Sequence, residues 1–202
     1  MIRVEPQPEP AEFDTRVRQR GRAWLQERGW LRAQPLPAGK SGDLPDYWRK
    51  CLTDLHSRYD GICAYLCVYI ERVTGGATVD HFIAKSPRPD LAYEWSNYRL
   101  ACSIMNSRKR DYSKVMDPFT IHDGWFRLEL VSGSIYPSPD LEGRQQEQVA
   151  YTIERLGLDD AGNRELRARH FQDFLEGEYT AAFLRKRSPF VYQEALREGY
   201  LE

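Results

Sequence analysis

Two stretches with the pattern of β-strands lie among longer stretches patterned for helix, and this mixture limits the chain to an α+β fold. Residues 63–72 are rich in β-branched and aromatic side chains, and residues 77–83 resume the same pattern. Between them, Thr74-Gly75-Gly76 has the composition of a tight turn. The sequence therefore predicts a β-hairpin here, and the alternating segment Trp125–Val131 predicts a further strand.

Helical patterns flank the hairpin on both sides. Apolar side chains recur at helical spacing in Ala11–Arg28 and Asp46–Tyr59, and again from Leu141 to the end of the sequence. The segment Arg32–Pro45 is rich in proline and glycine, which predicts a linker. It contains Gly39-Lys40-Ser41 but lacks the earlier glycine of a phosphate-binding loop, so we interpret it as a solvated linker.

The charge balance of the chain is close to neutral, since 29 lysines and arginines face 30 aspartates and glutamates. A protein that coats nucleic acid through bulk charge is usually far more basic, so this class is excluded, whereas a local basic site is not. The longest apolar run, Ile62–Ile70, is about half of what a bilayer crossing needs, and no secretion signal is visible. We therefore expect a cytoplasmic protein without a membrane-spanning segment.

Asp80, His81 and Asn106 are residue types that together suit metal-dependent hydrolysis of phosphate esters. Asp80 and His81 are adjacent on a predicted strand, so a carboxylate and an imidazole can serve different partners at one site. Asn106 opens a predicted short helix over 107–112 and offers a neutral oxygen ligand. One carboxylate and one amide oxygen suit Mg²⁺ or Mn²⁺, because coordination positions remain for water and phosphate. A neutral histidine beside such a metal can accept a proton from the attacking water.

The sequence around Asp80 and His81, followed by Asn97 and Asn106, resembles the HNH (ββα-metal) endonuclease family over roughly residues 60–118. The resemblance implies an α+β fold in which a β-hairpin and a helix form the nuclease core, embraced by N- and C-terminal helices. It implies metal-dependent cleavage of DNA phosphodiester bonds. Carried over by position, Asp80 is a metal ligand, His81 the general base, Asn97 a brace of the hairpin and Asn106 the second metal ligand.

The same resemblance divides the chain into three segments. Residues 1–56 are expected to form an N-terminal helical extension with the Pro/Gly linker, and residues 57–120 the HNH nuclease core. Residues 121–202 are expected to form short strands and a C-terminal helical extension.

Sequences beyond the core resemble a narrower group of HNH proteins. Asp117-Pro118-Phe119, and the helical stretches Ile153–Leu158 and Leu166–Arg169, look similar to HNH proteins that are paired with ABC-type ATPases. Such pairs occur in antiphage systems of the Septu kind and in some retron systems. The resemblance implies an ATPase subunit as a partner and a function in antiviral defence.

Many HNH proteins of this kind hold a structural zinc ion between two Cys-x-x-Cys pairs, and this chain departs from that pattern. The first pair would be Cys63 with Leu66 and the second Cys102 with Met105, so each pair lacks one sulfur ligand. Cys67 lies one residue too late. Because a structural zinc site needs four ligands in a tetrahedral array, we expect no structural zinc here.

Basic residues gather around the expected site in an otherwise balanced sequence. We expect them to bind DNA phosphates, with Lys109 a candidate to steady the scissile one; they are Arg99, Arg108, Lys109, Arg110 and Lys114. Two alternatives to a DNA nuclease stay open. One is cleavage of RNA of the tRNA type, and the other is a non-catalytic adaptor subunit that keeps the fold.

Overall fold

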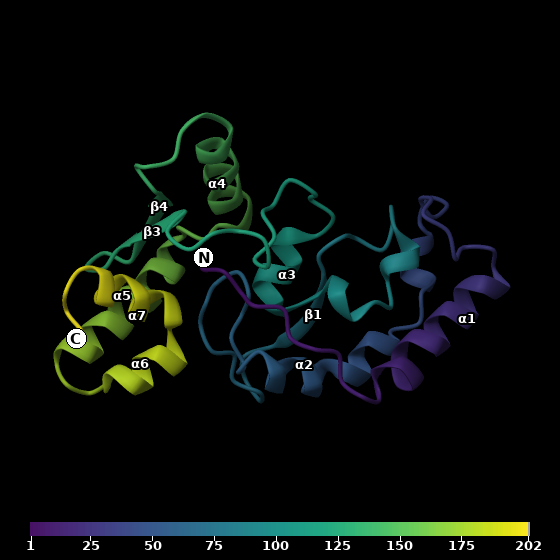
Figure 1. The fold of residues 1–202 in the computed structure, drawn as a ribbon, viewed down its shortest axis with the longest axis horizontal. Helices are drawn as coiled ribbons and strands as arrows, with labels where there is room; N and C mark the ends of the chain where they lie inside the picture. Colours follow the sequence, from purple (N-terminus) through teal and green to yellow (C-terminus); the bar gives the residue numbers. More distant parts are fainter. Residues whose placement is uncertain (202) are drawn as a thin grey trace. The chain divides into compact units, whose positions relative to one another are not determined.

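The computed structural model describes residues 1–201 as a mixed α+β fold of helices and two small antiparallel sheets (Figure 1). No helix in this described part of the chain is long and apolar enough to cross a membrane. Contacts within the chain define two compact units, which cut across the three segments expected from the sequence. Unit 1 comprises Met1–Glu5, Ile62–Ile70 and the chain from Lys114 onward, and unit 2 comprises Pro6–Gly61 and Glu71–Ser113.

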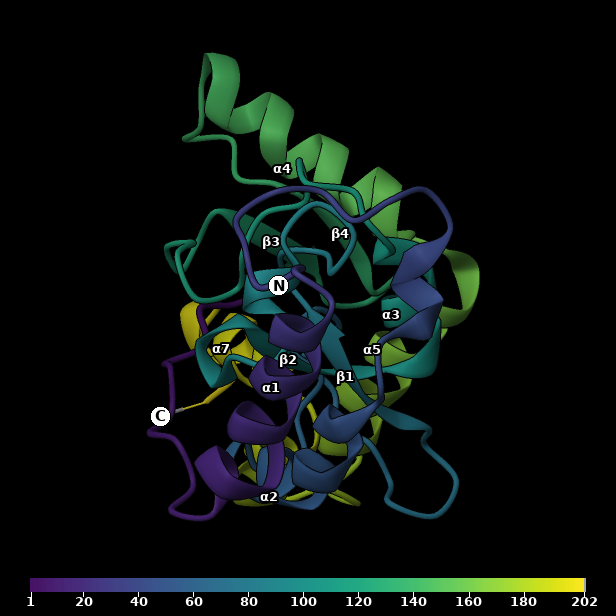
Figure 2. The same ribbon diagram turned by 90° about the vertical axis from the view of Figure 1, so that its right-hand side faces the viewer.

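Unit 2 contains the first sheet and the helices that pack on it. A π-helical turn at Asp14–Arg18 continues into α1 (Gln19–Glu27), and 3-10 turns at Lys40–Asp43 and Tyr47–Cys51 precede α2 (Leu52–Arg58). Strand β1 (Ala77–His81) pairs antiparallel with β2 (Tyr98–Cys102), which runs directly into α3 (Ser103–Lys109). Helices α2 and α3 pack on opposite faces of this strand pair (Figures 1 and 2).

The predicted hairpin is wrong in its pairing. Strand β1 pairs with β2, so that Asp80 lies opposite Arg99, and it does not pair with residues 63–72. That stretch contains no regular strand and forms only an isolated bridge between Ile62 and Tyr69. Most of its apolar side chains are buried, but Cys67 adopts a left-handed backbone conformation (φ 57°) that interrupts an extended chain.

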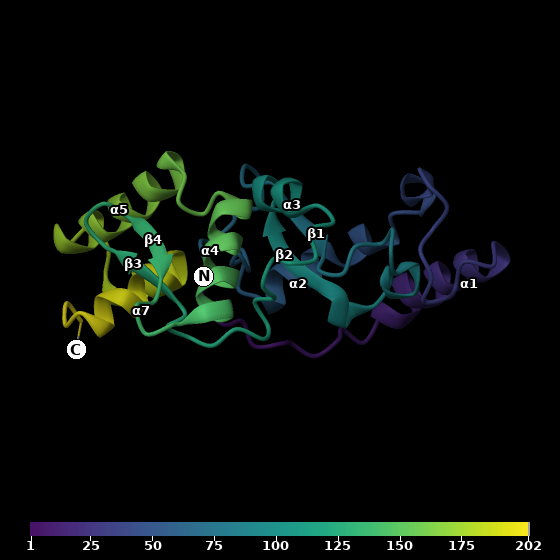
Figure 3. The ribbon, with the colours of Figure 1, turned by 90° about the horizontal axis from the view of Figure 1, so that it is seen from above.

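Unit 1 contains the second sheet and the C-terminal helices, as the sequence pattern predicted. Strands β3 (Phe126–Glu129) and β4 (Ser134–Pro137) pair antiparallel, and α4 packs on β4 while α7 packs on β3 (Figure 3). The helices are α4 (Gly143–Leu156), α5 (Ala161–Leu175), α6 (Ala181–Arg187) and α7 (Pro189–Arg197). Helix α4 ends where Gly157 adopts a left-handed conformation (φ 59°), which a glycine adopts without steric cost.

Aromatic side chains connect the N-terminal part of unit 2 to its sheet. Phe13 packs edge-to-face on Trp95 and Tyr98, with ring centroids 5.5 and 5.8 Å apart. Gly21 of α1 lies against the ring of Tyr93, whose hydroxyl donates a hydrogen bond to the carbonyl oxygen of Pro45 (2.8 Å). The N-terminal part of unit 2 is therefore included in the core of this unit.

We expect Gly21→Ala to destabilise unit 2 by about 1–3 kcal/mol, because its new Cβ would lie 2.1 Å from the buried ring of Tyr93. Gly42→Ala is the matched control, since no atom of residues 1–201 lies within 4 Å of its Cβ position. Its free energy of unfolding should change by less than about 0.5 kcal/mol. Denaturant unfolding of both variants and the parent measures the difference, and equal midpoints for the two variants would contradict this packing.

Candidate functional site

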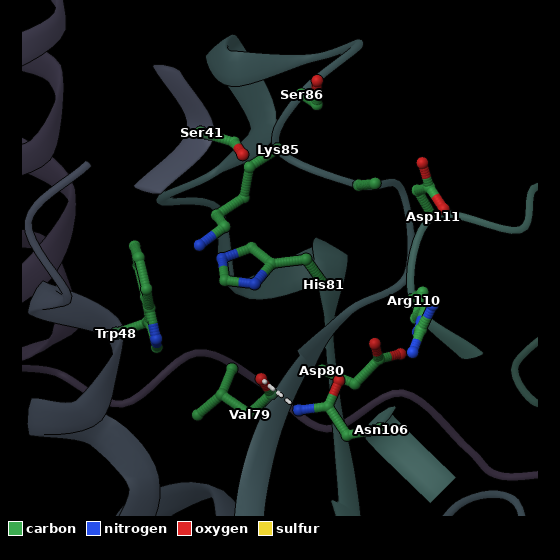
Figure 4. Close-up of a pocket in the computed structure, with 11 residues that line it drawn as sticks. Ser41, Trp48, Val79, Asp80, His81, Lys85, Ser86, Asn106, Arg110 and Asp111 are labelled. Atoms are coloured by element: carbon green, nitrogen blue, oxygen red, sulfur yellow. Dashed lines mark hydrogen bonds between the residues drawn. The ribbon is translucent and has the colours of Figure 1, made fainter. Parts of the chain in front are cut away.

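One pocket of unit 2, with a volume of about 430 Å³, is lined by four of the polar residues predicted from the sequence: Asp80, His81, Asn106 and Arg110 (Figure 4). Three segments of the chain line it. The N-terminal region contributes Ser41 and Trp48; β1 and the loop after it contribute Val79, Asp80, His81 and Ala84–Ser86; and α3 with the following turn contributes Asn106, Arg110 and Asp111.

Asp80 is buried and paired with a buried lysine. Its Oδ1 atom lies 3.5 Å from Nζ of Lys109, and the two side chains are 2% and 1% exposed. Nζ of Lys109 also donates hydrogen bonds to the carbonyl oxygens of His81 (3.0 Å) and Phe82 (2.7 Å). The two opposite charges compensate each other in the interior, and the lysine ties the end of α3 to the end of β1.

Asn106 is oriented by two hydrogen bonds that leave its side-chain oxygen in the pocket. Its Nδ2 group donates to Oγ1 of Thr78 (3.1 Å) and to the carbonyl oxygen of Val79 (3.4 Å). Within residues 1–201, Oδ1 of Asn106 has no hydrogen-bond donor, and Figure 4 shows it turned toward Asp80. The sequence placed the start of the helix wrongly, since Asn106 lies in the middle of α3.

Asp80 and Asn106 thus offer a carboxylate oxygen and an amide oxygen to the same pocket. This donor set suits a hard divalent cation such as Mg²⁺ or Mn²⁺, which retains water and takes further ligands from phosphate. In the described part of the chain, no three side chains of the His, Cys, Asp and Glu types converge as a metal site. A cation in this pocket would therefore depend on Asp80, Asn106 and ligands from outside the protein.

His81 is held in one tautomer by a backbone carbonyl. Its Nε2 atom lies 2.8 Å from the carbonyl oxygen of Ala92, and because a carbonyl only accepts, Nε2 carries the proton. Nδ1 is then the unprotonated nitrogen, and none of residues 1–201 hydrogen-bonds to it. The ring packs edge-on to Trp48 and Tyr98, with centroids 4.8 and 5.1 Å apart.

The surroundings of His81 favour its neutral form. The side chain is only 8% exposed. Burial first, and then the positive charges of Lys85 and Lys109, lower the pKa of His81 to about 3, although its bond to Ala92 opposes the shift. The imidazole is therefore uncharged near neutral pH and can accept a proton at Nδ1.

Asn97 does not line the pocket but closes the loop between β1 and β2. Its Oδ1 atom accepts a hydrogen bond from the backbone N–H of Ile83 (2.8 Å). Its Nδ2 group donates to the carbonyl oxygens of Ile83 (2.9 Å) and Leu91 (3.1 Å), and its own carbonyl accepts from Phe82 (2.9 Å). The side chain of Asn97 thus forms hydrogen bonds with backbone groups that have no partner strand in this irregular loop.

The five basic residues expected to bind DNA phosphates differ in their burial, and their binding to DNA stays a prediction. Arg99 is 4% exposed and donates to the carbonyl oxygens of Ser96 (2.8 Å) and Tyr98 (2.9 Å). Lys109 is buried as described above, because backbone carbonyls and Asp80 replace its water shell. Lys114 is exposed but belongs to unit 1. Arg108 is half-buried, and of the five only Arg110 lines the pocket.

Arg110 reaches the pocket through a strained backbone. Its φ of 47° and ψ of −125° form a conformation that residues other than glycine rarely adopt. Two bonds hold it there: its N–H donates to the carbonyl of Asn106 (3.1 Å), and its carbonyl accepts from Nζ of Lys109 (3.4 Å). Such strain persists only where the surrounding structure enforces it, which is common at functional sites.

Sequence reasoning missed five polar or aromatic residues that line the pocket: Ser41, Trp48, Lys85, Ser86 and Asp111. Ser41 fell in the segment interpreted as a solvated linker, but a 3-10 turn forms at Lys40–Asp43. Lys85 follows the Asp80-His81 pair by only a few residues, and this proximity was the available signal.

The four positions of the missing zinc knuckle are divided between the two units. Cys63 and Leu66 belong to unit 1, whereas Cys102 and Met105 belong to unit 2. Sγ of Cys63 accepts a hydrogen bond from the backbone N–H of Leu66 (3.5 Å). That no structural zinc is bound stays a prediction, which elemental analysis of the purified protein would test.

No known protein family matches this chain, and no curated protein matches its sequence. The functional interpretation therefore depends on the geometry and chemistry of the pocket.

We expect Asn97→Ala to lower the free energy of unfolding by about 2–4 kcal/mol, because it removes the hydrogen-bond partners of three partly buried backbone groups. Asn106→Ala is the comparison, since that half-exposed side chain bonds only Thr78 and Val79; its cost should be about 1 kcal/mol or less. Denaturant unfolding measures both values. Equal losses in the two variants would contradict the bracing role of Asn97.

Proposed function

We propose that this protein is a metal-dependent endonuclease of the HNH kind that hydrolyses DNA phosphodiester bonds. The observation that carries the proposal is the meeting of Asp80, His81 and Asn106 in one pocket. The order of elements supports it, since two antiparallel strands (β1, β2) lead directly into a helix (α3) that packs on them. The loop closed by Asn97 occupies the position at which the family resemblance expects a brace.

Asp80 and Asn106 are the residues that would hold Mg²⁺ or Mn²⁺. When bound, such a metal supplies positive charge that stabilises the attacked phosphate and the departing oxygen. Lys109 already offsets the charge of Asp80, so the site alone has little excess negative charge. We therefore expect weak metal binding in the free protein and tighter binding when phosphate oxygens complete the ligand set.

His81 is the proposed general base. Ala92 fixes Nε2–H, so the proton of the attacking water would go to Nδ1. The rings of Trp48 and Tyr98 restrict rotation of the imidazole, which keeps Nδ1 directed to one place. An anionic phosphate beside the ring would oppose the effect of Lys85 and Lys109 and make Nδ1 more basic.

We expect the chain alone to bind DNA weakly, and this expectation favours a partner. Arg110 is the one member of the expected basic cluster at the pocket, and the net charge of the whole chain is −1. A second subunit that holds the DNA would supply the missing affinity. The resemblance to ATPase-paired HNH proteins makes an ABC-type ATPase in an antiphage system the partner that we propose.

We expect His81→Ala to reduce DNA cleavage by about 10²- to 10⁴-fold while metal affinity is retained, because Nδ1 acts on water and not on the metal. Asn106→Ala should also reduce cleavage, but by weakening metal binding, so high Mn²⁺ should restore part of it. Ser107→Ala is the control in α3, since its hydroxyl bonds only Ile104 and lies outside the pocket.

Cleavage of plasmid DNA and of structured RNA, titrated with Mg²⁺ and Mn²⁺, measures these effects. Near-wild-type cutting by His81→Ala would contradict its role as the base. Cutting of RNA alone would favour the RNA nuclease. Metal binding with no cleavage of either, even with the ATPase partner present, would favour the adaptor subunit.

Asp80→Asn is expected to lose activity together with stability. It leaves the buried ammonium of Lys109 without its counter-charge, which costs about 3–5 kcal/mol. Lys109→Met removes the same ion pair, together with the hydrogen bonds of Nζ to the carbonyl oxygens of His81, Phe82 and Arg110. The double variant Asp80→Asn/Lys109→Met should lose less stability than the sum of the two single variants, because neither charge stays buried without its partner, while cleavage stays lost. Denaturant unfolding and cleavage assays of the three variants measure this. If the two single losses simply add in the double variant, the ion pair does not have the structural role described here.

A further inference from the structure

The loop after β1 places the positively charged side chain of Lys85 in the pocket without an acidic partner. Lys85 is half-buried, and its Nζ atom lies 4.1 Å from the ring centroid of Trp48. Within residues 1–201, no group accepts a hydrogen bond from this ammonium and no carboxylate lies within ion-pair distance of it. Burial lowers the pKa of Lys85, and the more distant charge of Asp46 opposes this shift.

Two serines lie with Lys85 on the same side of the pocket. Figure 4 shows Ser41, Lys85 and Ser86 on the side of His81 away from Asn106. The carbonyl oxygen of Ser86 accepts a hydrogen bond from the N–H of Leu36 (2.8 Å), which ties the segment that carries Ser41 to the loop. The hydroxyl of Ser41 has no hydrogen-bond partner in the described part of the chain. We call Ser41, Lys85 and Ser86 the Lys85 subsite.

The chemistry of the Lys85 subsite selects an anion. An ammonium offers only donors, so Nζ of Lys85 suits the oxygens of a phosphate, and the serine hydroxyls on the same side of the pocket can also act as donors. A second metal ion is disfavoured beside the positive charge of Lys85. Stacking of a base on Trp48 is also disfavoured, because Lys85, His81 and Tyr93 already contact its ring.

We propose that the Lys85 subsite binds the DNA phosphate next to the scissile one, so that the pocket holds two consecutive phosphates of one strand. The identity of the scissile position rests on the proposed function, whereas the anion site itself rests on Lys85 and Ser41. Lys85 is a positioning residue in this proposal. It fixes which phosphate lies beside Asp80, Asn106 and Nδ1 of His81.

The test is the salt dependence of DNA binding, measured without divalent metal. Each phosphate contact of a cation contributes about 0.9 to the slope of log affinity against log salt for duplex DNA. Lys85→Met keeps the apolar stem over Trp48 but removes the charge. We expect its slope to be smaller by about 0.9, with affinity about tenfold lower at 0.1 M salt. Lys85→Arg should keep most of the slope.

Lys40→Met is the matched control. It removes the same charge from the segment that carries Ser41, but Lys40 lies outside the pocket and its Nζ pairs with Asp43 at 3.0 Å. Its slope should equal that of the parent chain. Fluorescence anisotropy with a short duplex between about 50 and 200 mM salt measures all four proteins, and thermal melts verify that each is folded.

Equal slopes for Lys85→Met and Lys40→Met overturn the Lys85 subsite, as does a parent chain that binds no DNA at low salt. A separate cleavage assay of the parent with Mn²⁺ keeps this result apart from the proposed function. Cleavage without a slope difference supports the proposed nuclease and contradicts the proposed phosphate contact of Lys85. A slope difference without cleavage, even with the ATPase partner present, means that the phosphate contact is supported and the proposed nuclease is contradicted.

Discussion

The ammonium group of Lys109 is the interaction on which the geometry of the pocket depends. At the end of β1, the carbonyl oxygens of His81 and Phe82 accept hydrogen bonds from Nζ of Lys109, and so does the carbonyl oxygen of Arg110 after α3. One buried cation bonds to all three and compensates the charge of Asp80. The buried Lys109, which substrate cannot reach, therefore fixes the positions of the proposed metal ligands and of the strained Arg110.

The short-range part of this site could be predicted from the sequence. Asp80 and His81 are neighbours on a strand, and alternation sends Asp80 toward α3 and His81 toward Trp48. Asn97 and Asn106 lie at the spacings that a loop, a second strand and a helix require. These relations are set within one stretch of chain, so the pattern of residue types is enough to indicate them.

The long-range part could not be predicted, for reasons that differ from residue to residue. Strand β2 was not predicted, because Arg99 makes its sequence look polar. In the structure, the guanidinium of Arg99 donates hydrogen bonds to backbone carbonyl oxygens. Residues 63–72 have the side chains of a strand but not its backbone, because Cys67 turns the chain. A backbone hydrogen bond between Leu36 and Ser86 holds the segment of Ser41 against the pocket. Backbone hydrogen bonds of this kind cannot be predicted from the pattern of side chains.

The N-terminal wall of the pocket limits how this protein can be divided. A fragment of residues 57–120 would carry the whole motif but would lose Phe13 from the rings of Trp95 and Tyr98. It would also lose α1 from Tyr93 and Trp48 from His81. Such a fragment would present a contiguous aromatic surface to water and aggregate rather than fold. The smallest transplantable piece of this protein is therefore set by its aromatic packing and is longer than its motif.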